Sequence, residues 1–156
     1  MKAHYYNTII NWTRNKGKGT ETYKAYTRDH TIEVKGKPTI EGSSDPDFLG
    51  DATRYNPEEL LLASLSSCHM LWYLHLCAEA GIIVTAYTDN AEGTMTETPD
   101  GSGHFTSVTL NPVVTVKETP MMEKANELHN KANKRCFIAN SCNFPVYHKP
   151  LCKKDI

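Results

Sequence analysis

Cysteine is the residue type with the clearest chemical potential in this sequence. None of the five cysteines stands in a C-x-x-C pair, and their odd number does not suggest a disulfide framework. Such thiols are expected to be free in a reducing compartment, where a disulfide would be transient and catalytic. The five are Cys68, Cys77, Cys136, Cys142 and Cys152.

A metal site is the first chemistry to consider, because Cys68, His69, His75 and Cys77 crowd into one short stretch. The stretch is predicted to be helical, and at 3.6 residues per turn Cys68 and Cys77 point to opposite faces. One ion cannot be held by both. The three later cysteines also lack a zinc-ligand spacing. No metal and no cofactor are therefore expected.

Redox chemistry at a thiol is the second possibility, with Cys68 as the candidate. Its place three turns into a helix is too deep for the helix dipole to lower its pKa, and burial would raise that pKa. A reactive Cys68 thiolate therefore needs a nearby cation. The arginines available are Arg54 before the helix, Arg28 and Arg14 on the N-terminal strands, and Arg135 beside the second candidate thiol.

The helix that carries Cys68 has clear start and stop signals. Asn56 is a good N-cap, Pro57 suits the first helical position and Glu59 completes a capping box. Gly81 is the expected residue after the C-terminus, so the helix should end near residue 80 and be about 36 Å long. It is apolar on nearly every side and must be surrounded by protein.

The other elements are predicted from residue alternation and turn residues. The segments INWT, TETYKAYT and HTIEVKG indicate strands, whereas residues 37–54 are typical of a loop. Two β-rich runs, residues 82–98 and 103–119, meet in a hairpin at TPDGSG. A second, amphipathic helix begins at Pro120, and NFPVYHKP forms a short edge strand. The order predicts an α+β fold with a mainly antiparallel sheet.

Composition indicates a soluble chain of 156 residues in one domain spanning 1–156. Its formal net charge of −1 and scattered basic residues give no reason to expect nucleic-acid binding. A membrane span is disfavoured because the apolar helix contains His69 and His75 and has no basic flank. No signal-peptide run is present, so the cytoplasm is the expected compartment.

Two segments together resemble the OsmC/Ohr family of thiol-dependent hydroperoxide reductases: NPEELLLASLSSCHM and NKANKRCFIANS. The resemblance covers nearly the whole chain. It implies an OsmC-like α+β fold with a long buried central helix and a second amphipathic helix, assembled as an intertwined homodimer. It also implies a cysteine peroxidase that acts on organic hydroperoxides in the oxidative stress response.

The resemblance assigns roles to individual residues. Cys68 matches the family's peroxidatic cysteine, Cys136 its resolving cysteine, and Glu58 the acid that holds a catalytic arginine. Cys68 would become a sulfenic acid, Cys136 would condense with it into a disulfide, and a dithiol reductant would restore the thiols. The arginine of the OsmC branch falls near Phe48, where this chain has none, so Arg54 is the candidate.

Several alternatives remain open. The chain could be a non-catalytic OsmC-like module that binds a small hydrophobic or thiol ligand at the dimer interface, or its thiols could be structural. Cys142 could replace Cys136 as resolving thiol. Trp72 and His75 could line a pocket for an apolar substrate. His69 is expected to be a hydrogen-bonded core histidine and Cys77 a packing residue.

Overall fold

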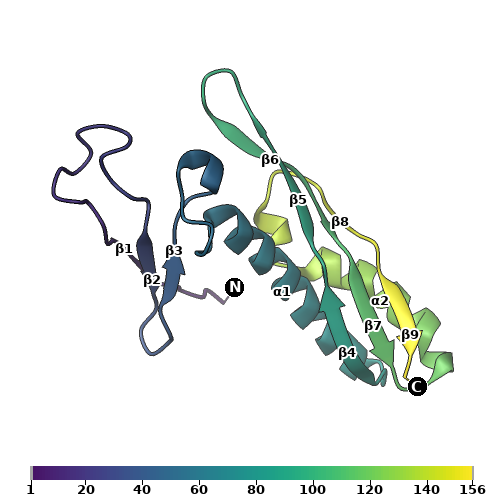
Figure 1. Cartoon of the computed structure of the whole chain (residues 1–156). Helices are drawn as coiled ribbons and strands as arrows, with labels where there is room; N and C mark the ends of the chain where they lie inside the picture. The colour runs from purple at the N-terminus through teal and green to yellow at the C-terminus, as the bar shows by residue number, and fades with distance from the viewer. Residues whose placement is uncertain (1, 156) are drawn as a thin grey trace. The chain divides into compact units, whose positions relative to one another are not determined.

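A computed structural model describes residues 2–155 and divides the chain into two compact units (Figure 1). Unit 1 comprises Met1–Leu60 and unit 2 comprises Leu61–Ile156. Each unit is described by itself below. The single domain spanning 1–156 remains a prediction.

Unit 1 contains a small antiparallel sheet in the order β1-β2-β3. Isoleucines form a row across it, because Ile10 pairs with Ile32 and Ile32 pairs with Ile40. Directly paired residues of a sheet share a face, so the row makes one side of this sheet apolar. The elements are β1 (Ile9–Trp12), β2 (His30–Glu33), β3 (Ile40–Gly42) and the short 3₁₀ helix η1 (Pro46–Phe48).

Two predictions for unit 1 are wrong. The segment TETYKAYT, residues 20–27, forms turns rather than a strand, and the Arg28 guanidinium lies over the rings of Tyr23 and Tyr26, 4.2 and 4.4 Å from their centroids. The cation–π contacts with Arg28 stabilise the turn conformation of these tyrosines, which are residues that otherwise favour a strand. The predicted loop 37–54 contains β3. Its residues do not have a strand-like sequence, and the strand forms because they pair with β2.

The predicted ends of the long helix are confirmed in α1 (Pro57–Glu79). The Glu59 backbone N–H donates to Asn56 Oδ1 at 2.8 Å, and the Asn56 N–H donates to Glu59 Oε2 at 3.1 Å, which completes the capping box. At the other end Gly81 adopts a φ of 71°, and Ile82 N–H donates to the Cys77 carbonyl at 2.9 Å. This is the hydrogen-bond pattern of a Schellman motif.

Unit 2 contains two three-stranded sheets, ordered β4-β7-β9 and β5-β6-β8. The hairpin between β5 and β6 and the late strand β8 are confirmed, whereas β9 was not predicted. Both β8 and β9 pair in parallel with their neighbours, and the other pairs are antiparallel. The strands are β4 (Val84–Asp89), β5 (Glu92–Glu97), β6 (Gly103–Leu110), β7 (Pro112–Val116), β8 (Val146–His148) and β9 (Leu151–Lys154).

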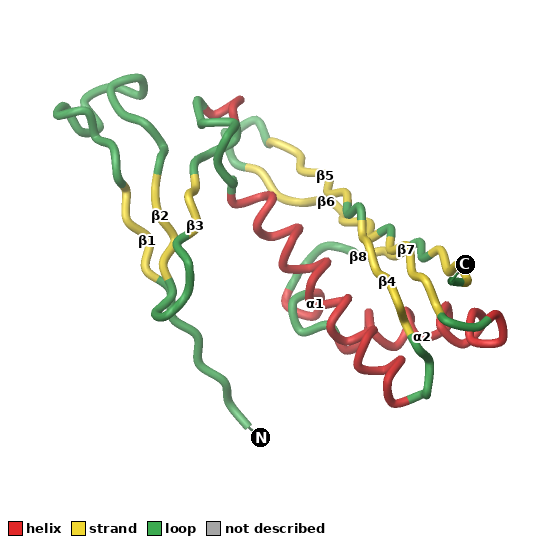
Figure 2. The backbone as a smooth tube through the Cα atoms, turned by 60° about the horizontal axis from the view of Figure 1, so that its bottom comes forward, coloured by secondary structure: helices red, strands yellow, loops and turns green. Residues whose placement is uncertain are grey.

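The second helix is confirmed as α2 (Met122–Arg135), between 3₁₀ turns η2 (Thr119–Met121) and η3 (Ala139–Ser141). Figure 2 shows α1 and α2 on the same side of the strands of unit 2. Their apolar faces meet in a core of Tyr73, Leu76, Cys77, Ala125, Leu128, Ala132, Val114, Val116 and Cys152. A smaller cluster gathers Leu65, Val108 and Leu110. The α+β class is therefore confirmed.

Helix α1 is long and apolar enough to cross a membrane by length and composition alone. One of its faces, however, is buried against protein, through residues such as Leu65, Tyr73 and Leu76. The opposite side is not covered within unit 2, since Leu71 is 63% exposed. A core helix of a soluble protein can have the same length and composition as such a span, so these two features alone are weak evidence for one.

Candidate functional site

Helices α1 and α2 supply the two thiols that the sequence singled out. Cys68 lies three turns from the start of α1 and is half-buried. Cys136 is the residue that ends α2, where its backbone leaves helical geometry (φ −66°, ψ 110°), and it is 1% exposed. Because the chain must turn at Cys136, the end of α2 fixes where this thiol points.

The structure brings these two thiols together. The Cys68 thiol lies close enough to Cys136 to raise the pKa of the Cys136 thiol. Burial, followed by this neighbouring thiol, raises the pKa of Cys136 to about 11, although the Ala139 N–H donates to its Sγ at 3.4 Å. Cys136 is therefore a neutral thiol at neutral pH, and all five cysteines are unpaired.

Arg54 and Glu58 belong to unit 1, whereas the thiol pair belongs to unit 2. The Arg54 guanidinium forms ion pairs with Glu41, with Asp51 at 3.7 Å and with Asp29 at 4.0 Å. Glu58 lies half-buried on the first turn of α1. The action of Arg54 and Glu58 on Cys68 stays a prediction.

The other two candidate arginines of unit 1 are also engaged. Arg14 pairs with Asp29 at 3.7 Å. Arg28 donates to the backbone carbonyls of Tyr26 at 2.8 Å and Tyr23 at 2.6 Å, in addition to its stacking on their rings. The guanidinium of Arg28 is therefore held in place from four sides.

A shallow apolar pocket of about 250 Å³ begins one helical turn beyond Cys68 on α1. It is lined by Leu71, Trp72 and His75 of α1 and by Phe137, the residue directly after Cys136. The Trp72 ring meets His75 and Phe137 edge to face, with centroids 5.7 and 5.6 Å away. Trp72 and His75 were predicted to line such a pocket, and Phe137 was missed.

The rim of this pocket carries charge. The Arg135 guanidinium lies 5.6 Å from the centroid of the Trp72 ring, and His75 Nε2 lies 3.4 Å from a Glu79 carboxylate oxygen. Arg135 therefore combines with an aromatic wall to place a cation near the pocket. Its position beside Cys136 was visible in the sequence, but its partner Trp72 was not.

A buried pair of histidines joins the two helices. His69 Nε2 and His129 Nδ1 are 3.0 Å apart, and the side chains are 0% and 1% exposed. His69 is thus the hydrogen-bonded core histidine that was predicted. Burial lowers the pKa of His69 to about 4 and that of His129 to about 3, so both rings are neutral at neutral pH.

The remaining cysteines lie outside the pocket. Cys77 and Cys152 are buried in the larger core cluster, as expected for Cys77, and Cys142 is half-buried beside the smaller one. Burial raises the pKa of all three thiols. Across residues 2–155, no group of three or more His, Cys, Asp or Glu side chains could hold a metal ion.

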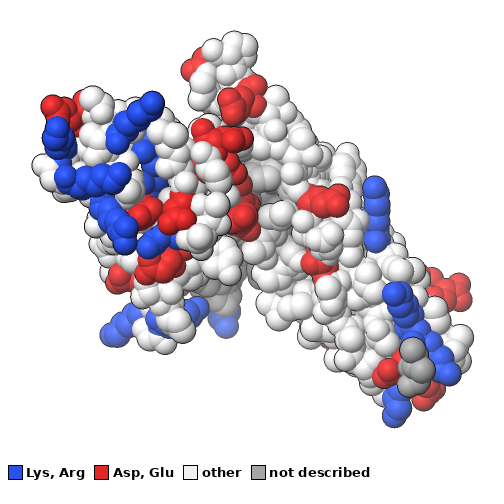
Figure 3. All heavy atoms as spheres, viewed as in Figure 1, with Lys and Arg blue, Asp and Glu red and all other residues white. Residues whose placement is uncertain are grey.

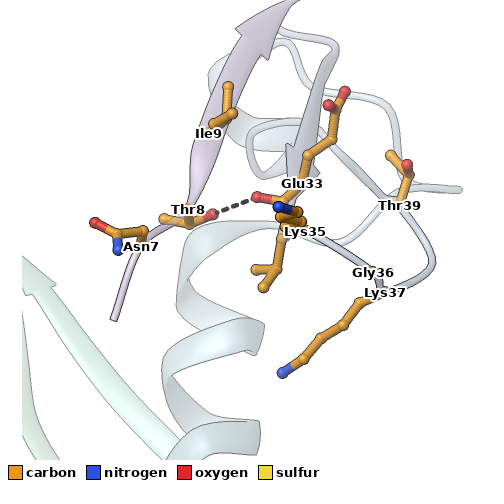
Figure 4. A pocket seen from close by; sticks show the side chains of 9 residues that line it. Asn7, Thr8, Ile9, Glu33, Lys35, Gly36, Lys37 and Thr39 are labelled. Carbon is orange, nitrogen blue, oxygen red and sulfur yellow. Dashed lines mark hydrogen bonds between the residues drawn. The ribbon is translucent and has the colours of Figure 1, made fainter. Parts of the chain in front are cut away.

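Unit 1 has its own hollow, of about 670 Å³, where strand β1 begins and strand β2 ends. Figure 4 shows Lys35 and Lys37 at this hollow and the hydrogen bond from Thr8 Oγ1 to the Glu33 carbonyl at 3.2 Å. Its lining contains no thiol. Figure 3 shows basic and acidic side chains mixed on the visible face of unit 1, which does not favour a polyanionic partner.

Comparisons with known proteins agree with this architecture. The sequence profile described as "OsmC-like protein" matches residues 50–149. A solved OsmC-like protein of unknown function from Vibrio cholerae is 34% identical, with a TM-score of 0.85 and coverage of 96% of this chain and 100% of that chain. No curated protein matches the sequence.

Two organic hydroperoxide resistance proteins share the fold at lower identity. The Elizabethkingia anophelis protein is 20% identical with a TM-score of 0.66, covering 99% of this chain and 100% of its own. The Legionella pneumophila protein, OsmC, is 20% identical with a TM-score of 0.68, covering 97% and 99%. At this identity the likeness concerns the fold alone.

Proposed function

The chain belongs to the OsmC-like protein family, and on this premise we propose that it is a thiol-dependent peroxidase that reduces organic hydroperoxides to alcohols. The observation that carries the proposal is the neighbouring pair Cys68 and Cys136, on two different helices and beside an apolar pocket. Two thiols in contact can exchange two electrons with a peroxide by forming one disulfide.

The proposed reaction begins at Cys68. Its thiolate attacks one oxygen of the O–O bond, the alkoxide leaves and takes a proton, and Cys68 becomes a sulfenic acid. The Cys136 sulfur then attacks the Cys68 sulfur and displaces the hydroxyl group as water. The balance is one hydroperoxide and two thiols converted to one alcohol, one water and one disulfide. An external dithiol reduces the disulfide and completes the cycle.

The different surroundings of Cys68 and Cys136 support the assignment of Cys68 to the first step and Cys136 to the second. Cys68 is half-buried and near the pocket, where a substrate has access. Cys136 is buried and protonated, so it is a poor first nucleophile, and its proton can leave with the departing hydroxide. The Ala139 N–H bonded to Cys136 Sγ stabilises the thiolate that must form in the second step.

The pocket suits the organic part of a hydroperoxide. Leu71, Trp72 and Phe137 offer apolar surface, and the rim cation at Arg135 adds positive potential. Arg54 and Glu58 are proposed to complete the site, as the family resemblance implies. A substrate held by its organic group places its O–O bond near Cys68, which favours organic hydroperoxides over hydrogen peroxide.

We propose further that the protein acts as a homodimer in the cytoplasm. Large apolar side chains lie exposed on both units, including Ile10 at 57% and Phe137 at 67%. Exposed apolar patches of this kind mark contact surfaces. The free state of all five cysteines fits a reducing compartment.

A turnover assay with an organic hydroperoxide and a dithiol reductant tests the proposal. Cys68→Ser should abolish consumption of the hydroperoxide, whereas Cys136→Ser should still form a sulfenic acid after one equivalent but should not form the intramolecular disulfide. Cys77→Ser is the matched control, since this thiol lies in the core and should leave the rate unchanged. Mass spectrometry of the oxidised protein should find Cys68 bonded to Cys136.

Absence of turnover in the unmodified protein would overturn the peroxidase proposal and favour the binding module instead. A bond between Cys136 and Cys142 would reassign the resolving role.

A further inference from the structure

The buried histidine pair has a geometry more specific than core packing requires. The His69 and His129 rings are nearly parallel, at 8°, with centroids 5.3 Å apart. With 3.0 Å between Nε2 and Nδ1, this separation is that of two imidazoles lying edge to edge in nearly one plane. The contact is therefore an aligned N–H···N hydrogen bond between α1 and α2, rather than face-to-face stacking.

Tyr73 closes the arrangement from a second direction. Its ring lies face to face with His129, at 3.8 Å between centroids and 12° between planes. Because Tyr73 follows His69 by four residues, both project from one face of α1. His129 of α2 is thus held at its edge by His69 and on its face by Tyr73, and all three side chains are at most 1% exposed.

The rings of His69, His129 and Tyr73, called the clamp below, lie near the thiol pair along both helices. His69 directly follows Cys68, and His129 lies seven residues before Cys136, about 10 Å along α2 and on nearly the same face. Beyond the apolar core that the two helices share, α2 therefore meets α1 at two polar points, the clamp and the thiol pair. Two separated contacts fix the axial position and the rotation of one helix against the other, whereas a single contact leaves a pivot.

We propose that His69, His129 and Tyr73 are positioning residues that hold the end of α2 against α1, so that Cys136 reaches the oxidised Cys68. The inference rests on the proposed function and deepens it, by assigning the second step of the reaction to an interhelical clamp. None of the three residues is proposed to touch the hydroperoxide.

The hydrogen bond needs one ring as donor and one as acceptor, which two neutral histidines supply in either tautomer. Either choice leaves His69 Nδ1 and His129 Nε2 without a hydrogen-bond partner in the described structure. A buried nitrogen without a hydrogen bond costs free energy of folding, and two apolar side chains would avoid that cost. Packing alone therefore does not account for two histidines here. Orientation of α2, which an aligned hydrogen bond enforces, does account for them.

The test separates the two steps of oxidation. Formation of the Cys68 sulfenic acid is followed by trapping with dimedone, and closure of the disulfide is followed by mass spectrometry on quenched samples. His129→Leu and His69→Leu should leave the first rate within about twofold, while closure slows about tenfold or more and the sulfenic acid accumulates.

A rescue variant distinguishes the hydrogen bond from ring volume. Gln Nε2 and Asn Oδ1 occupy roughly the positions of His Nε2 and Nδ1, so the double variant His69→Gln/His129→Asn keeps one N–H···O bond between the helices. Its closure rate should recover most of the loss. Val114→Ala is the matched control, because it removes buried volume from the core of unit 2. It should lower the melting temperature without slowing closure.

The same closure is also measured with diamide, which oxidises neighbouring thiols without a peroxide. If the unmodified protein reacts with diamide but not with hydroperoxides, the proposed function fails while the clamp remains measurable. Two results would overturn the clamp: closure in the Leu variants at the unmodified rate, or an equal slowing in Val114→Ala.

Discussion

Side-chain surroundings give chemically identical residues different behaviour in this chain. Cys68 and Cys136 are neighbours, yet one is half-buried beside a pocket and the other is 1% exposed with a raised pKa. Burial disfavours the charged thiolate, which makes Cys136 suited to react second. The same cause acts on the histidines with the opposite sign, because protonation is the step that charges an imidazole.

The two buried histidines predict loss of stability in mild acid. Their pKa values in the folded protein, about 4 for His69 and about 3 for His129, lie below the ordinary value of 6.5. The unfolded chain therefore takes up two more protons than the folded protein once the pH falls below about 6.5. The free energy of unfolding should decrease by up to about 2.7 kcal/mol per pH unit between about pH 6 and 4.

Urea unfolding at a series of pH values from 7 to 4.5 measures this slope. The variant His69→Gln/His129→Asn, which has no titrating group at either position, should lose most of it. His148, whose pKa burial also lowers, is retained in both proteins, and its ring lies 5.7 and 6.4 Å from the His69 and His129 rings, so its charge contributes to their lowered pKa values. An unchanged slope in the variant would show that other groups govern acid unfolding.

At the scale of elements, α1 depends on its caps because it positions Cys68 and three of the four residues that line the pocket. Its capping box satisfies backbone N–H groups that have no partner within the helix. Asn56→Ala removes the side-chain acceptor and should lower the free energy of unfolding by about 1 kcal/mol. Asn56→Ser keeps an acceptor at the cap and should lose much less.

Thermal and urea unfolding of the two variants measure this difference. Equal losses in Asn56→Ala and Asn56→Ser would mean that the side-chain hydrogen bond to Glu59 does not stabilise the helix.

At the scale of the whole molecule, the isoleucine row of unit 1 predicts association. Ile10, Ile32 and Ile40 form an apolar strip across three paired strands, and Ile10 is 57% exposed. A second copy of the chain is the proposed cover. Sedimentation or light scattering should therefore give about 35 kDa, twice the chain mass of 17.5 kDa.

Ile10→Glu should shift this mass toward the monomer, because it places a charge in the apolar strip. Asn11→Glu is the matched control, since successive residues of a strand point to opposite faces of the sheet. A monomer for the unmodified chain at micromolar concentration would contradict the proposed dimer.

Local signals in the sequence were sufficient to predict the two α-helices. The ends of α1 follow from Asn56, Glu59 and Gly81, because capping depends on residues within one turn. The amphipathic spacing of α2 likewise needs no distant partner. Strand β9 was missed because its partner β7 lies far back along the chain, and β3 was missed because its own three residues give no strand signal without the pairing to β2. The TETYKAYT segment was misassigned because Arg28 stacks on its tyrosines.

The sequence by itself determined the α+β class, the helix that carries Cys68, and the two thiols to compare. Only the tertiary structure decided that Cys68 and Cys136 meet, that Phe137 completes the pocket and that His129 is the partner of His69. Propensity and capping act over a few residues, whereas these contacts join positions about sixty residues apart or more. Such positions become neighbours only when the two helices pack against the strands of unit 2.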